Sequence, residues 1–247
     1  MAALTRIAGL APSPVLTARL RRSAHLLPAC DLMRAHVDDP AWAMLLDAVT
    51  VQETRLFRHP EQCTAAAAAL PERLAAAGTE GRPLRLLSAG CATGEEAFTL
   101  GAMALAAAEQ TPGAPIEVLG LDLCRPALAS AEAGVIGYGL GNPLGLVSAG
   151  FRRWLAAPDG VPLLHPALRR VLHFGRANLL DGVDPGAGFD VIFCRNVLIY
   201  LTEPARAAVL GVLAAALRPG GLLALGPTDR APGGLPRIAE NLWQMRR

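Results

Sequence analysis

The chain has 247 residues, 52% of them hydrophobic, and a formal net charge of +2 at pH 7. No stretch reaches the roughly 18 uninterrupted apolar residues that a membrane span requires, so we expect a soluble, cytoplasmic protein with no membrane insertion. All 23 basic residues are arginines, dispersed along the chain and nearly balanced by 21 acidic residues. This distribution argues against a nucleic-acid partner, and nothing in it indicates more than a monomer.

The five cysteines are an odd number, widely spaced and without a Cys-x-x-Cys pair. We therefore expect neither a disulfide framework nor a metal site, and interpret each cysteine as a small buried hydrophobe. Pro12 and Pro14 interrupt the short apolar stretch at the start of the chain, so no secretory signal is expected.

Residues 1–78 carry a helical pattern, with candidate helices at 15–27, 42–50 and 63–77 and no strand pattern. We predict a helical N-terminal domain and linker here, with a boundary in the Gly/Thr/Pro-containing stretch 78–83 and a second domain at 79–247. The first helix carries a cluster made up of Arg19, Arg21 and Arg22. This cluster is either a solvated helix face or a docking surface for an acidic partner helix.

The stretch from Leu84 to Glu96 predicts the first strand, loop and helix of a nucleotide-binding α/β domain. Gly90 and Gly94 allow a sharp turn and the close approach of a ligand. Glu95 and Glu96 follow in the first helical turn, where carboxylates repel phosphate but can pair with the cationic amino group of S-adenosylmethionine. They could also be ordinary helix-start residues. The Gly-x-x-x-Gly spacing disfavours a nicotinamide dinucleotide.

The second predicted strand, 116–121, is closed by Asp122. An acid at this place binds ribose hydroxyls in such domains, although Asp122 could equally cap the next helix. The alternation of strands and helices then stops, and residues 138–174 look like a small inserted β-subdomain with a hairpin from 161–164 and 169–174.

The alternation resumes at Phe189–Cys194, an apolar strand suited to a sheet covered on both faces. A helix at 203–217, a helix stop and turn at Arg218-Pro-Gly-Gly221, a strand at 222–225 and an edge strand within 238–245 complete the prediction. Ligands of such sheets lie beyond the carboxyl ends of the strands. The candidate residues at these ends are Ala89–Gly94, Asp122, Asn178 and Asn196.

Four motifs occur in a characteristic order: Ser-Ala-Gly-Cys-Ala-Thr-Gly-Glu-Glu, Asn-Leu-Leu-Asp, Phe-Asp-Val-Ile-Phe-Cys-Arg-Asn-Val-Leu-Ile-Tyr and Leu-Arg-Pro-Gly-Gly. Together they resemble the CheR-type chemotaxis-receptor glutamate O-methyltransferases. The resemblance implies a Rossmann-like S-adenosylmethionine-dependent methyltransferase domain with a small inserted β-subdomain, preceded by a short helical domain. It also implies that the segment 51–58, Val-Gln-Glu-Thr-Arg-Leu-Phe-Arg, belongs to the active site.

The same resemblance implies individual roles. The methionine part of the cofactor would be held by Ala89 and Glu95, beside Gly90, and its ribose by Asp122. Arg58 would line the cofactor and hold the substrate carboxylate, and Tyr200 would hold a positioning role in the pocket, although Tyr200 could also be a core aromatic residue. The remaining residues of the implied cofactor pocket are Gln52, Thr54, Asn178, Leu179, Arg195 and Asn196.

The implied reaction is methyl transfer from S-adenosylmethionine to glutamate side chains on the cytoplasmic helices of chemoreceptors, yielding methyl esters and S-adenosylhomocysteine. A glutamate is ionised near neutral pH and attacks the sulfonium methyl in line, so no strong base is required. The sequence departs from the family pattern at Gln52, at Pro227-Thr-Asp229 and in its short N-terminal region. These departures leave two alternatives: a methyltransferase for another signalling protein, or a cofactor-binding regulatory module without turnover.

Overall fold

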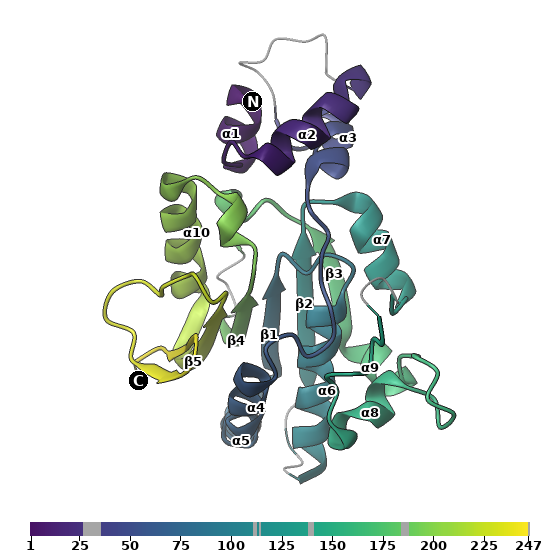
Figure 1. Ribbon diagram of the computed structural model, residues 1–247. Helices are drawn as coiled ribbons and strands as arrows, with labels where there is room; N and C mark the ends of the chain where they lie inside the picture. The colour runs from purple at the N-terminus through teal and green to yellow at the C-terminus, as the bar shows by residue number, and fades with distance from the viewer. Residues whose placement is uncertain (27–35, 111–112, 114, 138–140, 184–187, 247) are drawn as a thin grey trace.

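A mixed sheet of seven strands forms the centre of the part of the chain that the structure describes, residues 1–26, 36–110, 113, 115–137, 141–183 and 188–246 (Figure 1). The structure is a computed structural model. The first five strands are parallel, and the last two form an antiparallel hairpin against β5. In order across the sheet, the strands are β3 (Leu172–Arg176), β2 (Ile116–Asp122), β1 (Leu84–Ala89), β4 (Phe189–Cys194), β5 (Leu217–Leu225), β7 (Leu242–Gln244) and β6 (Arg237–Ala239).

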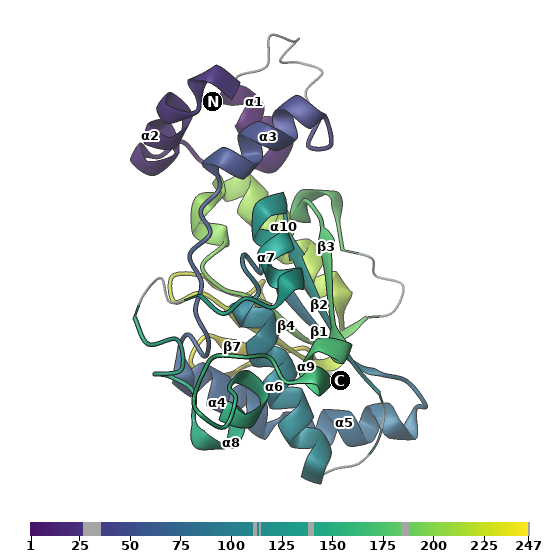
Figure 2. The same ribbon diagram turned by 90° about the vertical axis from the view of Figure 1, so that its right-hand side faces the viewer.

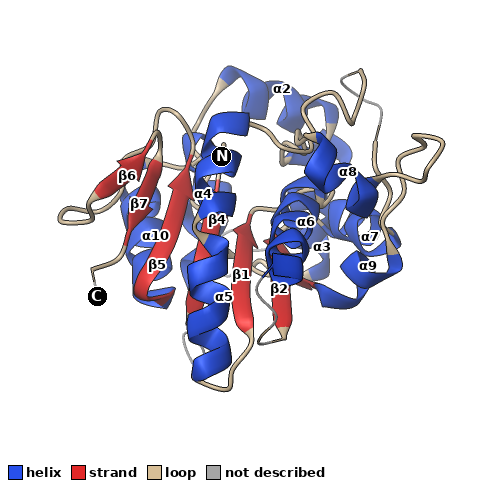
Figure 3. Cartoon of the chain, turned by 90° about the horizontal axis from the view of Figure 1, so that it is seen from below, coloured by secondary structure: helices blue, strands red, loops and turns tan. Residues whose placement is uncertain are grey.

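Helices cover both faces of this sheet, which explains why its central strands are apolar throughout (Figure 3). Alternate residues of one strand point to opposite faces, so Leu86 packs into the cluster on one face and Leu87 into the cluster on the other. The predicted α/β class is confirmed. The first face is covered by α4 (Pro60–Ala68), α5 (Leu70–Thr79), α6 (Glu95–Gln110), α8 (Ala149–Leu155) and α9 (Pro166–Val171), and the second by α10 (Glu203–Ala216).

The strand order reverses at β1, because the chain passes to β2 on one side of it and later returns to β4 on the other. Such a switch point opens a crevice at the carboxyl ends of the strands, where α/β folds bind ligands. A further helix, α7 (Arg125–Ala133), follows β2 and packs beside β3.

Three N-terminal helices lie above this end of the sheet (Figures 1 and 2). They are α1 (Ala2–Ala8), α2 (Pro14–Arg22) and α3 (Pro40–Val49), and we refer to the described residues 1–26 and 36–49 as the cap. Two of the helices begin at side-chain caps followed by proline: Ser13 accepts a hydrogen bond from the Leu16 N–H, and Asp39 accepts from the N–H groups of Ala41 and Trp42. The cap has its own hydrophobic cluster, in which Trp42, Leu45 and Leu46 are at most 2% exposed.

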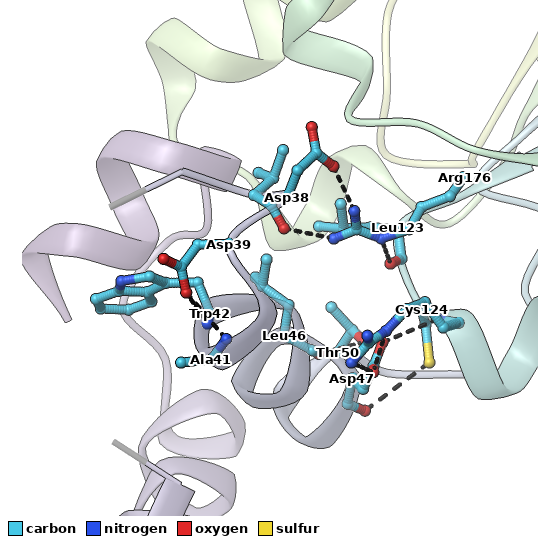
Figure 4. Close-up of polar contacts among 12 residues, drawn as sticks. Asp38, Asp39, Ala41, Trp42, Leu46, Asp47, Thr50, Leu123, Cys124 and Arg176 are labelled. Carbon is cyan, nitrogen blue, oxygen red and sulfur yellow. Dashed lines mark hydrogen bonds and ion pairs between the residues drawn. The ribbon is translucent and has the colours of Figure 1, made fainter. Parts of the chain in front are cut away.

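Ion pairs fasten the cap to the sheet (Figure 4). The Arg125 guanidinium, at the start of α7, pairs with Asp47 of α3 at 2.6 Å between Nη2 and Oδ2. Arg176, at the end of β3, donates to Asp38 Oδ1 at 2.5 Å and to the carbonyl oxygens of Val37 and Leu123. The cap is therefore held directly over the ends of β2 and β3.

The break in packing does not coincide with the boundary predicted at 78–83. Leu70 and Leu74 of α5 belong to the main cluster on the sheet, and Arg73 donates from Nη2 to the Gly220 carbonyl at 2.6 Å. The helices α4 and α5, which we predicted as part of the N-terminal domain, thus pack with the sheet. The separate cluster of the cap ends at Val49, and the main cluster begins at Leu56.

The predicted hairpin from 161–164 and 169–174 is wrong. Among the described residues 141–171, the chain forms α8, α9 and only one isolated bridge, between Ala156 and Pro162. The run 169–174 instead spans the end of α9 and the start of β3, whose residues pair in parallel with β2. The strand-like pattern in 169–174 therefore reflects pairing with the main sheet and not with residues 161–164. Residues 138–140 of the expected subdomain lie outside the described residues.

Two further differences lie near the C-terminus. Arg218–Gly221, predicted as a turn, is an irregular first part of β5, where the pairing with β4 shifts from Leu217 to Leu222. Gly220 has φ of 76° there, which glycine adopts without strain. The tail supplies two strands, β6 and β7, where we predicted one. No helix in the described ranges combines the length and apolar character needed to cross a membrane.

Candidate functional site

A cavity opens at the carboxyl ends of β1, β2, β3 and β4, below the cap, where the connection from α3 to α4 also passes. Most of the predicted cofactor residues line this cavity, although they come from segments far apart in the sequence. The predicted residues in its lining are Gln52, Thr54, Arg58, Gly90, Asp122, Asn178, Leu179, Arg195, Asn196 and Tyr200.

The loop between β1 and α6 follows the cavity floor, and its backbone leaves no room for a side chain at Gly90. Gly90 has φ of 81°, and a Cβ atom there would lie 2.4 Å from Val197 Cγ2. Ala92, with φ of 49°, presents its N–H to the end of β2. Ala89 is fully buried at the end of β1 and is not part of the cavity lining. The group that approaches Gly90 closely is thus the Val197 side chain, so the close approach of a ligand expected at the glycines stays a prediction.

Asp122 closes β2 at the edge of the cavity. Its Oδ2 accepts the Ala92 N–H at 2.8 Å, and its Oδ1 accepts the Cys124 N–H at 2.9 Å. Burial raises the pKa of this carboxyl above its usual value, while the hydrogen bonds from Cys124 and Ala92 act in the opposite direction. The alternative that Asp122 caps the next helix is wrong, because the cap residue of α7 is Cys124, whose side chain makes no capping hydrogen bond. Each Asp122 oxygen has a further lone pair, so the carboxylate can still accept hydrogen bonds from a diol.

Glu95 and Glu96 point to different places, although both are at most 6% exposed. Glu95 accepts from the Thr93 hydroxyl at 2.6 Å and lines a second cavity, on the other side of residues 51–54, together with Gly137 and Asn142. Glu96 lines the main cavity and accepts from the Ser88 hydroxyl at 2.7 Å. The carboxylate in the main cavity therefore belongs to Glu96, whereas Glu95 lies in the second cavity with the predicted cofactor residues Gln52 and Thr54.

Arg195 is a buried part of the cavity lining and joins three segments. Its Nε donates to Glu96 Oε2 at 2.8 Å, and its Nη1 donates to the Arg58 carbonyl and, at 3.3 Å, to Gln62 Oε1. Burial is the largest influence and would lower the pKa of this guanidinium, but the charges and hydrogen bonds of Glu96 and Cys63 together outweigh it, and the pKa is raised. Arg195 therefore remains charged and binds residues 58–62 to α6 and β4.

Residues 50–58 form the side of the cavity that joins the cap to the sheet. Gln52 Nε2 donates to the Thr50 hydroxyl at 2.9 Å, while the buried Gln52 Oε1 has no hydrogen-bond partner. Arg58 Nη1 donates to the Glu53 carbonyl at 3.3 Å, and its Nη2 lies 3.6 Å from Glu53 Oε1. The Arg58 side chain is 20% exposed, so its guanidinium remains accessible from the cavity.

Asn178, Asn196 and Tyr200 come from the loops after β3 and β4. Asn178 Nδ2 donates to the Ile7 carbonyl of α1 at 2.9 Å. Asn196 adopts φ of 60°, and its buried Oδ1 has no partner. Tyr200 is half-buried, and its pKa is raised by burial and by the charge of Glu53. The structure therefore favours a position in the cavity wall over a core aromatic residue for Tyr200.

The three arginines of α2 differ in their surroundings. Arg19 Nη1 donates to the Thr50 carbonyl at 2.6 Å and lines the second cavity, so it fastens α2 to the segment that carries Gln52. Arg21 and Arg22 are exposed. The cluster predicted as one surface is thus divided into one anchoring and two exposed side chains.

Sequence reasoning missed part of the lining. Ala8, Leu10 and Leu16 of the cap face the cavity, as do Leu123 and Leu201. Leu123 follows Asp122 directly and could have been found from that position. The apolar cap residues belong to no recognisable motif, and only the tertiary structure places them at the cavity.

The cavity fits S-adenosylmethionine by the chemistry of its lining. Glu96 and the unpartnered oxygens of Gln52 and Asn196 offer acceptors to a cationic amino group, and Asp122 offers acceptors to a ribose diol. The leucines from the cap and from the ends of the strands suit a planar apolar ring.

The sequence model of the family described as "CheR methyltransferase, SAM binding domain" matches residues 52–243. The "Probable biofilm formation methyltransferase WspC" of Pseudomonas putida is 37% identical over 225 residues, which cover 88% of this chain and 51% of that protein. The "Chemotaxis protein methyltransferase 1" of Pseudomonas aeruginosa is 34% identical over 193 residues, which cover 75% of this chain and 69% of that protein. The chain therefore spans about half the length of the WspC protein that it matches.

Among solved structures, an S-adenosylmethionine-dependent methyltransferase from Geobacter sulfurreducens in complex with S-adenosyl-L-homocysteine aligns at 16% identity and a TM-score of 0.38. The alignment covers 74% of this chain and 53% of that chain. At this TM-score it supports no conclusion about the chain. The family match covers most of the chain, and its S-adenosylmethionine-binding region includes the cavity loops after β1, β2, β3 and β4. The chain belongs to the CheR methyltransferase family and carries its S-adenosylmethionine-binding domain.

Proposed function

We propose that this chain transfers the methyl group of S-adenosylmethionine to glutamate side chains of a chemoreceptor-type signalling protein in the cytoplasm. The observation that carries the proposal is the family match over residues 52–243, which includes the cavity with Arg58 and Tyr200 in its wall. The cofactor supplies an electrophilic methyl group on a sulfonium. The product on the acceptor is a glutamate methyl ester.

Arg58 is the residue that we assign to the acceptor carboxylate. Its guanidinium is accessible from the cavity and pairs only loosely with Glu53, at 3.6 Å between Nη2 and Oε1. A planar guanidinium can hold a carboxylate through two parallel hydrogen bonds, which would orient one carboxylate oxygen for attack. Tyr200 lies in the same wall, and its hydroxyl would fix the second side of the carboxylate.

Catalysis in this proposal depends on orientation and not on proton transfer. A glutamate carboxylate has a reference pKa of about 4.3, so it is already the nucleophile near neutral pH. Holding the two reactants in line and excluding water can supply several kcal/mol of barrier reduction. Arg195 and Glu96 contribute indirectly, because their buried pair positions residues 58–62 beside the cavity.

The exposed face of α2 is the docking surface that we propose for the receptor helix. Arg21 and Arg22 are exposed there, and Val15, at 53% exposure, lines the cavity from the same helix. Basic side chains beside an apolar contact suit an acidic amphipathic helix that carries glutamates. Arg19 supports this surface by its hydrogen bond to Thr50.

A second candidate function is methylation of a receptor in a biofilm-type signalling system. The 37% identity to the Pseudomonas putida protein named as a biofilm formation methyltransferase favours it. The reaction and the site are the same in both cases, and only the acceptor differs.

The test is transfer of labelled methyl from S-adenosylmethionine to membranes that contain one class of host receptor at a time, followed by mild alkali. Methyl esters release volatile methanol in base, so base-released label on either receptor class supports the proposal and identifies the acceptor. Receptors whose candidate glutamates are changed to alanine are the control. Label that resists alkali, or no label on any receptor while calorimetry shows cofactor binding, would overturn it.

A further inference from the structure

The arginine that we assign to the acceptor carboxylate, Arg58, lies between two residues with left-handed backbone conformations. Phe57 has φ of 49° and His59 has φ of 57°. Residues other than glycine rarely adopt positive φ, and they keep it only where the surrounding structure enforces it. The contacts that enforce this turn, residues 57–59, therefore determine where the Arg58 side chain begins.

Thr99 of α6 holds the backbone of the turn. Its hydroxyl accepts a hydrogen bond from the Phe57 N–H at 3.0 Å and donates one to the Glu95 carbonyl at 2.8 Å. The Thr99 side chain is fully buried, so water cannot take its place. Without this hydroxyl the Phe57 N–H would be left buried and unsatisfied, which opposes the conformation of the turn.

The carbonyl groups of the turn are held as well. The Arg58 carbonyl accepts hydrogen bonds from Arg195 Nη1 and from the Cys63 thiol, the latter at 3.4 Å. The His59 carbonyl accepts the Cys63 N–H at 3.1 Å. Residues of α4, α6 and the end of β4 therefore fix three consecutive residues of the chain.

The side chain of Phe57 is fixed by a segment that is distant in sequence. Its ring stacks on the ring of Phe151, with the centroids 4.9 Å apart and the planes at 23°. Phe57 is buried and Phe151 is partly buried against the same cluster. Phe151 belongs to α8, within the region 138–174 that we predicted as an insertion, so this region contacts the turn that carries Arg58.

We propose that Thr99 and Phe151 are positioning residues for methyl transfer, which hold the turn 57–59 so that the Arg58 guanidinium meets the acceptor carboxylate in one orientation. The hydroxyl fixes the backbone before Arg58, and the stacked ring fixes the neighbouring side chain. Neither residue lines the main cavity or the second cavity. The inference rests on the proposed function for the role of Arg58.

The test compares Thr99→Val with Thr99→Ser in the full chain. Valine keeps the shape of threonine but accepts no hydrogen bond, whereas serine keeps the hydroxyl. Single-turnover methyl transfer to receptor membranes should slow roughly ten- to 100-fold in Thr99→Val and keep the unchanged rate in Thr99→Ser. The Kd of S-adenosylhomocysteine, measured by calorimetry, should stay the same in both variants.

The matched control is Thr79→Val, at a helical threonine whose hydroxyl donates to the Ala75 carbonyl, four residues earlier. Thr99 makes the same kind of bond to Glu95, so the control removes that bond without disturbing the turn. Thr79→Val should keep the unchanged rate. An unchanged rate in Thr99→Val, or a rate in Thr99→Ser as low as in Thr99→Val, would overturn the inference.

A double variant separates positioning of Arg58 from general damage to the protein. In an Arg58→Ala background, Thr99→Val should lower the rate no further, because no guanidinium remains to be misplaced. Phe151→Leu removes the stacked ring but keeps an apolar side chain, and it should show the same dependence on Arg58 if Thr99→Val folds poorly. Losses that multiply in the double variants would overturn the inference.

Hydrogen exchange of the Phe57 amide, followed by NMR, requires no methyl acceptor. Exchange should be about tenfold faster in Thr99→Val than in Thr99→Ser, because only valine leaves the N–H without its acceptor. Equal exchange in the two variants would overturn the inference whatever the acceptor is. Faster exchange in Thr99→Val, in a protein that methylates no receptor, would instead overturn the proposed acceptor and support the role of Thr99 in holding the turn.

Discussion

The guanidinium of Arg195 lies against the carboxylate of Glu96, with Nε and Oε2 at 2.8 Å and the two side chains 1% and 8% exposed. The pair joins the loop after β4 to the first turn of α6. Through the Arg58 carbonyl and Gln62, it also holds the connection that leads from the cap to α4. The end of the segment 51–58 is therefore positioned by a buried charge pair in the cavity wall.

We predict that Glu96→Gln destabilises the protein by about 3 to 5 kcal/mol, because it leaves the buried Arg195 charge without its partner. Urea denaturation of the variant and of the unchanged protein measures the difference. Glu95→Gln is the matched control, since Glu95 accepts from the Thr93 hydroxyl and an amide oxygen can replace it. Equal loss in both variants would contradict the assignment of the pair.

Asp122→Ala should weaken S-adenosylmethionine binding by about 1.5 to 3 kcal/mol, the range for hydrogen bonds to a charged group. Calorimetry at pH 7 measures the effect, and Asp159→Ala, an exposed acid outside the cavity lining, is the control. Burial raises the pKa of Asp122, so this carboxylate is protonated at a higher pH than an ordinary aspartate. The affinity of the unchanged protein for S-adenosylmethionine should therefore begin to fall at that higher pH when the solution is acidified. An unchanged Kd would refute the ribose assignment.

Arg58→Ala should lower the rate of methyl transfer by roughly 100-fold or more, since a misplaced acceptor loses the benefit of orientation. The Kd of the cofactor should change much less. Single-turnover transfer and calorimetry on the same preparation separate the two effects. Arg55→Ala is the comparison, because Arg55 is on the same segment but lines the second cavity. A parallel fall in affinity and rate would make Arg58 a cofactor ligand only.

His59 should make stability depend on pH. Burial, and then the charge of Arg195, lower the pKa of His59 from its ordinary value of 6.5. Below pH 6.5 the unfolded chain therefore binds a proton that the folded chain does not, so stability falls as pH decreases from 6.5 toward the folded pKa.

Urea unfolding at pH 7.5, 6.5 and 5.5 checks this dependence. His59→Asn should flatten it, since asparagine tolerates the φ of 57° at this position and does not titrate. His36→Asn, at a side chain that is 68% exposed, is the control. A pH dependence that survives His59→Asn would assign it to another group.

Much of the sheet could be predicted from the sequence alone. The strand β4 has the predicted bounds, and β1 begins at Leu84 as predicted, because both strands are apolar runs between clear turn signals. The residues at the strand ends, Gly90, Asp122, Asn178 and Asn196, could also be placed, since a parallel sheet brings the carboxyl ends of its strands to one edge. Four of the five cysteines, Cys63, Cys91, Cys124 and Cys194, are buried as predicted, and Cys30 lies outside the described residues.

Local pattern determined the strands, the glycine loop and the order of the motifs, because these depend on the chain's own periodicity and backbone freedom. Only the tertiary structure decided that Glu96, and not Glu95, faces the main cavity, because adjacent helical residues differ by about 100° in direction and their partners are distant in sequence. It also decided that 172–176 joins the main sheet and that Leu10 closes the cavity. Both arrangements depend on packing against segments more than forty residues away in the sequence, and a local sequence pattern does not predict such contacts.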